Sequence, residues 1–296
     1  MRPFLSILKA TALEILSEPL TLLVLLAALA LAVLAPAFHY HQFGDPTRMA
    51  RDAGFSALLT CGSAVAVFCT IRAFRREIES GTMDMALAHA VSRSSFFLAK
   101  AAGAFLAYLV FATTVLGVTM VMFEGAAIGG VIAKRTGDIA RIFGPCLAVA
   151  VAVIVVPLVL GAILNRFARC RFVLSAVFIA LALATSAGIV CGVISGAFVL
   201  RLVPVVLLIT LPTAVLLAAA AAFATRLKAN AAAAAVGVVL VLLVPMIGNY
   251  YLVDALARSG SVPWHYLALA VVVTLPAIIA FLLLGVGFAA RTGERP

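Results

Sequence analysis

Long apolar segments, separated by short polar ones, run along almost the whole chain. Eight of these segments approach the roughly 20 residues that an α-helix needs to cross the hydrocarbon core of a membrane. Because lipid offers the backbone no hydrogen-bond partners, segments of this kind are expected to be helical. The expected spans are residues 20–38, 55–72, 101–123, 146–164, 172–196, 203–224, 230–248 and 265–289.

The composition excludes an ordinary soluble domain. Of the 296 residues, 66% are hydrophobic and 11% are charged, whereas soluble domains carry about 25% charged residues. So much apolar surface requires lipid as the solvent. We therefore predict an all-α, polytopic membrane helix bundle of about eight transmembrane helices, which forms a single domain over residues 1–296.

The first 19 residues have a different, amphipathic pattern. The apolar face of the expected helix holds Phe4, Leu5, Leu8, Ala12, Ile15 and Leu16, and the polar face holds Ser6, Lys9, Glu14 and Ser17. Such a pattern is typical of a helix that lies in the membrane interface. Pro19 ends it and allows a turn into the first span. We predict an interfacial helix over residues 1–19, with a frayed N-terminal extension as the alternative.

The distribution of basic residues predicts the orientation of the spans. If the N-terminus is cytoplasmic, 14 of the 21 Lys and Arg residues fall on the cytoplasmic side and seven on the other side. Basic residues favour the cytoplasmic side, so we expect both termini there, in a multi-pass protein of the inner (plasma) membrane. The net charge of +10 is dispersed over loops, which indicates contact with membrane lipid and not with nucleic acid.

Motifs of catalysis and metal binding are absent from the sequence. We find neither a G-x-x-x-x-G-K-[ST] phosphate loop nor an H-E-x-x-H helix, so we expect no enzyme, no bound cofactor and no metal site. The cysteines lack C-x-x-C spacing and are expected to be small packing residues; they are Cys61, Cys69, Cys146, Cys170 and Cys191.

Glycines repeat at every fourth position in the fifth expected span. Gly188, Gly192 and Gly196 form a double G-x-x-x-G pattern, which allows another helix to approach closely. We expect this helix packing to be intramolecular, with a contact between subunits as the alternative.

The segment from Arg72 to Lys100 is the one long polar interruption of the apolar pattern. It reads RAFRREIESGTMDMALAHAVSRSSFFLAK and holds eight of the 32 charged side chains. A plain connector between two spans needs only a few residues. A solvated loop is the simpler interpretation, but the length and polarity favour a surface that binds a separate protein.

This segment resembles the characteristic region of ABC-2-type permeases, the transmembrane subunits of type-2 ABC exporters. That family places an acidic, Gly-Thr-containing turn after its second span, then a short helix, a Val-Ser-Arg turn and a Lys that begins the third span. The matching residues are Glu77, Glu79, Gly81, Thr82, Leu87, Val91, Ser92, Arg93 and Lys100. Two departures are Ala90, where family members often carry Pro, and the expected eight spans, where many members have a six-helix core.

The resemblance implies a cytoplasmic coupling helix between spans two and three, within residues 72–100. Gly81 allows a tight turn, and Thr82 can cap the short helix. Met83, Met85 and Leu87 give that helix an adaptable apolar face. Either Ser92 or Ser94 can cap the helix of the third span. The residues expected to dock a partner ATPase are Glu77, Glu79, Gly81, Thr82, Met83, Met85, Leu87, Val91, Ser92 and Arg93.

The resemblance further implies an exporter built of two permease subunits, identical or paired, and two ABC ATPase subunits that bind ATP and Mg. One alternative is an ABC complex that serves the assembly of a metalloenzyme or a surface machine. The other is an ion-coupled secondary carrier. Such carriers need buried ionisable groups, and Glu124, near the outer end of the third span, is the nearest candidate.

Overall fold

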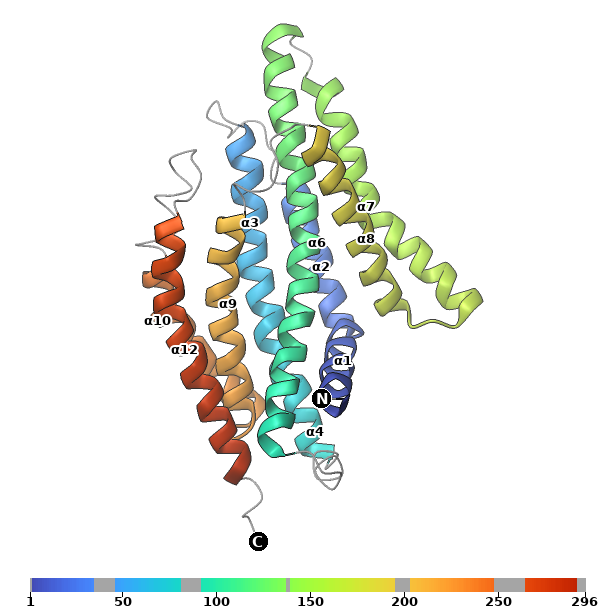
Figure 1. Cartoon of the computed structure of the whole chain (residues 1–296). Coiled ribbons are helices and arrows are strands. Elements are labelled where there is room, and N and C mark those ends of the chain that lie inside the picture. Colours follow the sequence, from blue (N-terminus) through green and yellow to red (C-terminus); the bar gives the residue numbers. More distant parts are fainter. Residues whose placement is uncertain are drawn as a thin grey trace. The chain divides into compact units, whose positions relative to one another are not determined.

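The computed structural model describes residues 2–34, 46–80, 92–136, 139–194, 203–247 and 264–291, and these residues form helices and short turns without a strand (Figure 1). The helices are α1 (Arg2–Leu16), α2 (Pro19–Leu34), α3 (Pro46–Ala64), the π-helix η3 (Val65–Cys69), α4 (Thr70–Ser80), α6 (Arg93–Thr136), α7 (Ile139–Ala168), α8 (Phe172–Ile194), α9 (Val203–Ala224), α10 (Ala229–Ile247) and α12 (Trp264–Arg291). The predicted all-α class is confirmed.

Six stretches of the described helices are long and apolar enough to cross a membrane. They are Ala50–Ser80, Arg93–Ala126, Ala148–Ala168, Phe172–Val193, Val206–Ala224 and Leu267–Ala290. The bent pair Pro3–Leu16 and Pro19–Leu34 gives a seventh if it is counted as one span, and Ala229–Leu243 is a shorter apolar helix. The chain therefore has the character of a multi-pass membrane protein. The described part of each of the eight expected spans is helical, and the number of spans stays a prediction.

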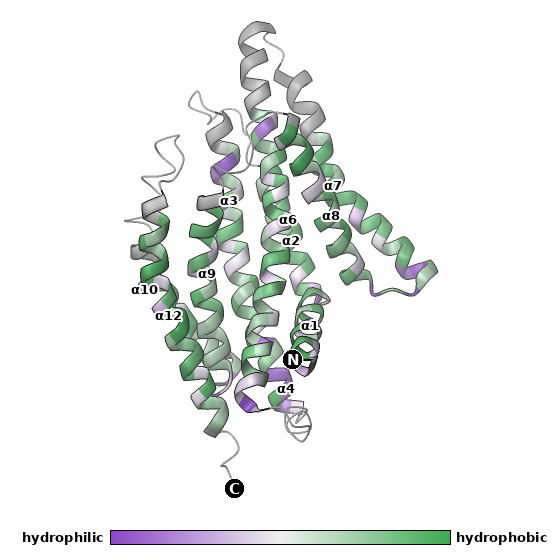
Figure 2. Ribbon diagram, viewed as in Figure 1, coloured by the Kyte–Doolittle hydropathy of each residue, from purple (hydrophilic) through white to green (hydrophobic). Residues whose placement is uncertain are grey.

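Most helical residues are hydrophobic, and hydrophilic residues are concentrated in a few places (Figure 2). Two of these places are the region of α4 with the start of α6, and the turn that joins α7 to α8. The first belongs to the polar segment that the sequence pattern singles out, and the second carries several arginines.

Helix α1 covers Arg2–Leu16 of the predicted segment 1–19, and α2 begins at Pro19 after a bend of 63°. The α1 side chains Ala12 and Ile15 are buried, whereas Leu5 is exposed. Gly103 of α6 permits close packing on this helix, because a Cβ there would lie 2.5 Å from the carbonyl oxygen of Leu8. Placement of α1 at the membrane surface stays a prediction.

The chain divides into two compact units. One comprises Met1–Ile15, Ser63–Tyr108 and Arg201–Pro296, and the other comprises Leu16–Gly62 and Leu109–Leu200. We refer to them as the first and the second unit.

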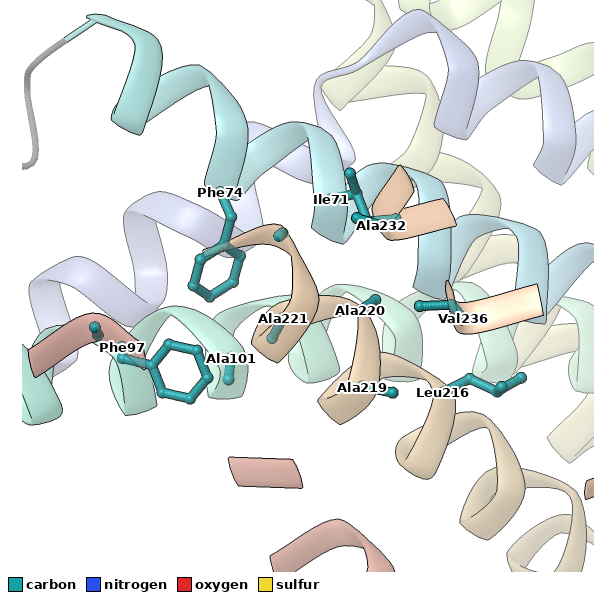
Figure 3. Packing of buried hydrophobic residues seen from close by; sticks show 12 residues of the cluster. Ile71, Phe74, Phe97, Ala101, Leu216, Ala219, Ala220, Ala221, Ala232 and Val236 are labelled. Atoms are coloured by element: carbon teal, nitrogen blue, oxygen red, sulfur yellow. The ribbon is translucent and has the colours of Figure 1, made fainter. Parts of the chain in front are cut away.

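A cluster of buried residues on α4, α6, α9, α10 and α12 forms the core of the first unit (Figure 3). Its centre is a run of alanines on α9, of which Ala219, Ala220 and Ala221 are fully buried. Small side chains let neighbouring helix backbones approach closely, which is how apolar helices associate without a hydrophobic driving force. The larger members of the cluster, Phe74 and Phe97, lie beside this run (Figure 3).

In the second unit, α6 crosses α8 at a glycine contact. A Cβ on Gly188 would lie 3.0 Å from the carbonyl oxygen of Gly117, and a Cβ on Gly117 would lie 2.5 Å from the carbonyl carbon of Ala184. The close approach at Gly188 is thus made within the chain. Gly192 is buried on the same helix, and Gly196 lies outside the described residues.

Two features of the spans differ from the sequence pattern. Helix α6 extends from Arg93 to Thr136, well beyond the expected 101–123, and no proline interrupts it. The second span contains the π-helical turn Val65–Cys69 between α3 and α4. Turns of this kind arise as local insertions in an α-helix and are frequent at functional sites.

Candidate functional site

The candidate site lies where α4 ends and α6 begins, in the first unit, and is centred on Lys100. The Lys100 side chain is 0% exposed. Its ammonium group lies 2.5 Å from Oε2 of Glu77 and donates a hydrogen bond of 2.7 Å to the carbonyl oxygen of Ala73. It also lies 5.2 Å from the ring centroid of Phe74. All three partners are on α4, so this one side chain fixes the start of α6 to the end of α4.

Burial of an ammonium group is tolerated only where its charge and its donors are satisfied. Here a carboxylate neutralises the charge of Lys100, a carbonyl oxygen accepts one hydrogen bond, and an aromatic face contributes a cation–π contact. Glu77 is 28% exposed in its side chain. The pair therefore has a buried cation and an anion at the rim of the site, within reach of water or of a partner.

Helix α1 joins the site through a second ion pair. Nη1 of Arg76 lies 3.6 Å from Oε1 of Glu14, and the Arg76 side chain is 70% exposed. An ion pair this exposed contributes little stability. It nevertheless places a flexible polar contact between α1 and the same turn of α4 that carries Glu77.

The last turn of α4 presents an acidic side chain outward. Glu79 is 63% exposed and accepts a hydrogen bond of 2.7 Å from Nη2 of Arg75, one turn earlier on the same helix. This pair adds only a few tenths of a kcal/mol to the helix. Glu79 can therefore exchange Arg75 for a cation on another protein at small cost.

Ser92 caps the start of α6. The backbone N–H of Ser95 donates to Oγ of Ser92 over 3.2 Å, and the N–H of Phe96 donates to its carbonyl oxygen over 3.0 Å. Of the two serines expected as caps, Ser92 has this role. The next residue, Arg93, donates from Nη1 to the carbonyl oxygen of Ala290 over 3.2 Å. That bond connects the start of α6 to the last turn of α12.

An aromatic pair, Phe74 and Phe97, packs beside the ion pair. The rings of Phe74 and Phe97 have centroids 5.5 Å apart, and Phe97 is buried. On its other side, Phe97 occupies the space beside Gly285 of α12, where any Cβ would overlap the ring. Phe97 of α6 thus packs between α4 and α12. Lys100, also on α6, makes its ion pair and its hydrogen bond with α4.

The structure brings together some of the predicted site residues and leaves others outside its description. Glu77 and Glu79 end α4, and Ser92 and Arg93 begin α6. Gly81, Thr82, Met83, Met85, Leu87 and Val91 lie outside the described residues. Glu77 and Lys100 are both in the sequence motif, but their pairing is not predicted by it. Sequence reasoning missed the contributions of Glu14, Arg76, Phe74 and Phe97 to the site. The one signal that could have pointed to them was Lys100, a lysine at the edge of an apolar span that requires partners.

A second buried charged residue lies in the second unit. Glu124 of α6 is 5% exposed, and its Oε1 has no hydrogen-bond partner among the described residues. Across that same part of the chain, no three His, Cys, Asp or Glu side chains are grouped so that they could hold a metal ion.

Comparison of the chain with protein-family models, curated proteins and solved structures gave no match. Any assignment of function therefore depends on the geometry of the site and on the local sequence pattern.

Proposed function

We propose that this chain is the membrane-spanning permease subunit of an ATP-driven exporter of the ABC-2 type. The observation that carries the proposal is the Lys100–Glu77 pair, because it joins the two ends of the one long polar segment at the point where two apolar helices emerge from it. A connector that only links two spans has no need for a fully buried cation at its end.

The proposed partner is a separate ABC ATPase, which binds ATP and Mg and docks on the segment between α4 and α6. Glu77, Glu79, Ser92 and Arg93 flank the docking surface in the described residues. By the sequence resemblance, Gly81, Thr82, Met83, Met85, Leu87 and Val91 complete it.

The contacts of the site give a route for mechanical force. Because Lys100 and Phe97 fix α6 to α4, a push on the intervening segment moves both helices together and does not merely flex a loop. The Arg93 bond to Ala290 extends the connected set to α12, and the Arg76 pair with Glu14 extends it to α1.

The complete transporter would contain two permeases, identical or paired, and two ATPases, with the cargo path between the permeases. In this arrangement both termini are cytoplasmic in the inner membrane, and α2 and α10 are the spans beyond the six that length and composition support. An ABC complex that assembles a metalloenzyme or a surface machine would use the same site and differ in its cargo.

Co-purification tests the proposal. The tagged chain, extracted from its native membrane in mild detergent, is expected to carry an ATPase whose activity vanadate inhibits. Replacement of Glu79 by Lys together with Gly81 by Trp is expected to reduce the recovered ATPase at least tenfold while the yield of the chain stays the same. Unchanged recovery of the ATPase with this variant would refute the docking surface.

An ion-coupled carrier is the second candidate, and Glu124 is the observation that favours it. A buried carboxyl group in a span often marks an ion path, and Glu124 meets that description. This alternative leaves the buried Lys100 pair without a role. Reconstituted protein whose ion-gradient-driven transport is abolished by Glu124→Gln, in the absence of any ATPase, would establish it over the permease.

A further inference from the structure

Helices α7 and α8 form a hairpin joined by three residues, Arg169, Cys170 and Arg171. The two helices pack closely near this turn, since a Cβ on Gly161 would lie 3.2 Å from the Cβ of Ala176. Side chains on either side of the turn are largely exposed. The hairpin therefore exposes its turn, residues 169–171 with Arg166 beside it, which we call the tip.

Three cations gather at this tip without a balancing anion. Arg166 lies in the last turn of α7, and Arg169 and Arg171 follow within the turn. All three are exposed, and none forms an ion pair within the part of the chain that the structure describes. The sequence from residue 139 to residue 194 contains neither Asp nor Glu. The tip is thus a concentrated positive charge that is available to bind an external anion.

The backbone conformation of Arg169 is a second, independent indication that the positive charge of the tip has a function. Its φ is 53°, and it is the one non-glycine residue with positive φ in the described chain. A helix that ends in this left-handed conformation usually has Gly at the position, because a Cβ there costs about 1 kcal/mol. The chain thus places a cation where glycine would be more stable, which indicates that the charge has a use.

The surroundings of the tip favour lipid as the source of the anion. Apolar side chains on the outer face of α7 are exposed up to the turn, among them Val159, Leu160, Ile163 and Leu164, and Phe167 beside the arginines is 83% exposed. In Figure 2 the hydrophilic turn interrupts otherwise hydrophobic ribbons. Arginines at such a boundary extend their heads to the headgroup layer while their stems cover apolar surface. A water-soluble acidic partner would not match this apolar approach.

We propose that the α7–α8 turn binds the phosphate of an anionic phospholipid through Arg166, Arg169 and Arg171, with Phe167 inserted among the acyl chains. The ligand class is an anionic glycerophospholipid of the leaflet that borders the turn. Each basic residue near an anionic membrane surface is worth about 1 kcal/mol, or about fivefold in affinity. The proposal stands whether or not the chain works with an ATPase.

A lipid titration tests the proposal on the purified full-length chain in dodecyl maltoside. Thermal unfolding is followed while dioleoylphosphatidylglycerol or dioleoylphosphatidylcholine is added. The variant Arg169→Gly/Arg171→Gln removes two charges and fits the left-handed backbone, so it is expected to be at least as stable as the native chain in phosphatidylcholine. Arg166→Gln/Arg171→Gln removes two charges without a change at Arg169. Lys228→Gln is the control, because this lysine is exposed and lies outside both the turn and the predicted interfacial helix α1.

The native chain is expected to be stabilised by phosphatidylglycerol at lower concentration than by phosphatidylcholine. Both arginine variants should need about 25-fold more phosphatidylglycerol for half of the effect, and the lysine control should behave as the native chain does. Equal responses to the two lipids, arginine variants that titrate like the native chain, or an equal loss in the lysine control would each overturn the proposal. So would an unchanged lipid response together with loss of a co-purifying protein, since the arginines would then contact that protein.

Discussion

The ammonium group of Lys100 lies 2.5 Å from the carboxylate of Glu77, and it thereby joins α6 to α4 across the polar segment that separates them in sequence. The cation is completely buried, whereas the anion is partly exposed. This asymmetry decides what happens when either partner is removed. Loss of the anion leaves a buried cation without a counterion, and loss of the cation leaves a carboxylate that water can still reach.

Replacement of Glu77 by Gln is therefore expected to destabilise the protein more than replacement of Lys100 by Met. Breaking a fully buried pair costs about 3–5 kcal/mol, and the partial exposure of Glu77 lowers our expectation for Glu77→Gln to about 2–3 kcal/mol. The double variant Glu77→Gln/Lys100→Met should recover much of that loss. Denaturant unfolding in detergent, followed by circular dichroism, measures these differences.

The control for this series is Arg75→Gln. Arg75 forms an exposed pair with Glu79 on the same helix, so its loss should cost less than about 0.5 kcal/mol. A cost equal to that of Glu77→Gln would show that surface charge, and not the buried cation, determines the result.

Two glycines of α12 are expected to respond oppositely to alanine. At Gly285 an added Cβ overlaps the ring of Phe97, whereas at Gly287 it meets nothing within 4 Å. Gly285→Ala should cost about 1–3 kcal/mol through overpacking, and Gly287→Ala should be neutral or stabilise by up to about 1 kcal/mol because alanine favours the helix. Midpoints of thermal unfolding compare the two.

A partial rescue would assign the loss at Gly285 to its contact with Phe97. Phe97→Leu shortens the ring side chain and should restore part of the stability of Gly285→Ala. If the single glycine variants were indistinguishable, the packing of α12 on α6 at Gly285 and Phe97 would be wrong.

Cysteine labelling is expected to place Ser94 on the cytoplasmic side. Ser94 lies in the first turn of α6, beside the proposed docking surface, and the basic residues predict that side for it. In a background with the five native cysteines replaced by alanine, Ser94→Cys should react with a membrane-impermeant maleimide in inside-out vesicles only. Reaction in intact cells would reverse the orientation and exclude docking of a cytoplasmic ATPase.

The helices of this protein follow from its sequence to a large extent, because the length of an apolar run is a local property. The expected span 203–224 coincides with α9. The expected span 172–196 begins at the same residue as α8, which ends at Ile194. The amphipathic start forms α1. The π-turn Val65–Cys69 has no such signal, since its sequence VAVFC is an ordinary apolar run.

The site is less accessible from sequence than the helices are. The motif includes Glu77 and Lys100, but their pairing depends on how α4 and α6 are rotated against each other. The position of Phe97 in the space beside Gly285 joins helices that are remote in sequence, and no local pattern records it. Likewise, only the structure shows that Arg93, expected to face a partner protein, also donates to α12.

Site-specific photo-crosslinking in native membranes tests the central proposal most directly. Benzoylphenylalanine placed at Ser80, which is exposed at the end of α4, is expected to crosslink the chain to a nucleotide-binding ATPase identified by peptide mass spectrometry. The same group at Phe167, on the exposed α7–α8 turn, should crosslink to lipid and not to the ATPase. Absence of an ATPase adduct from Ser80, with the chain folded and in the membrane, would contradict the proposal that a separate ATPase drives this protein through the segment between α4 and α6.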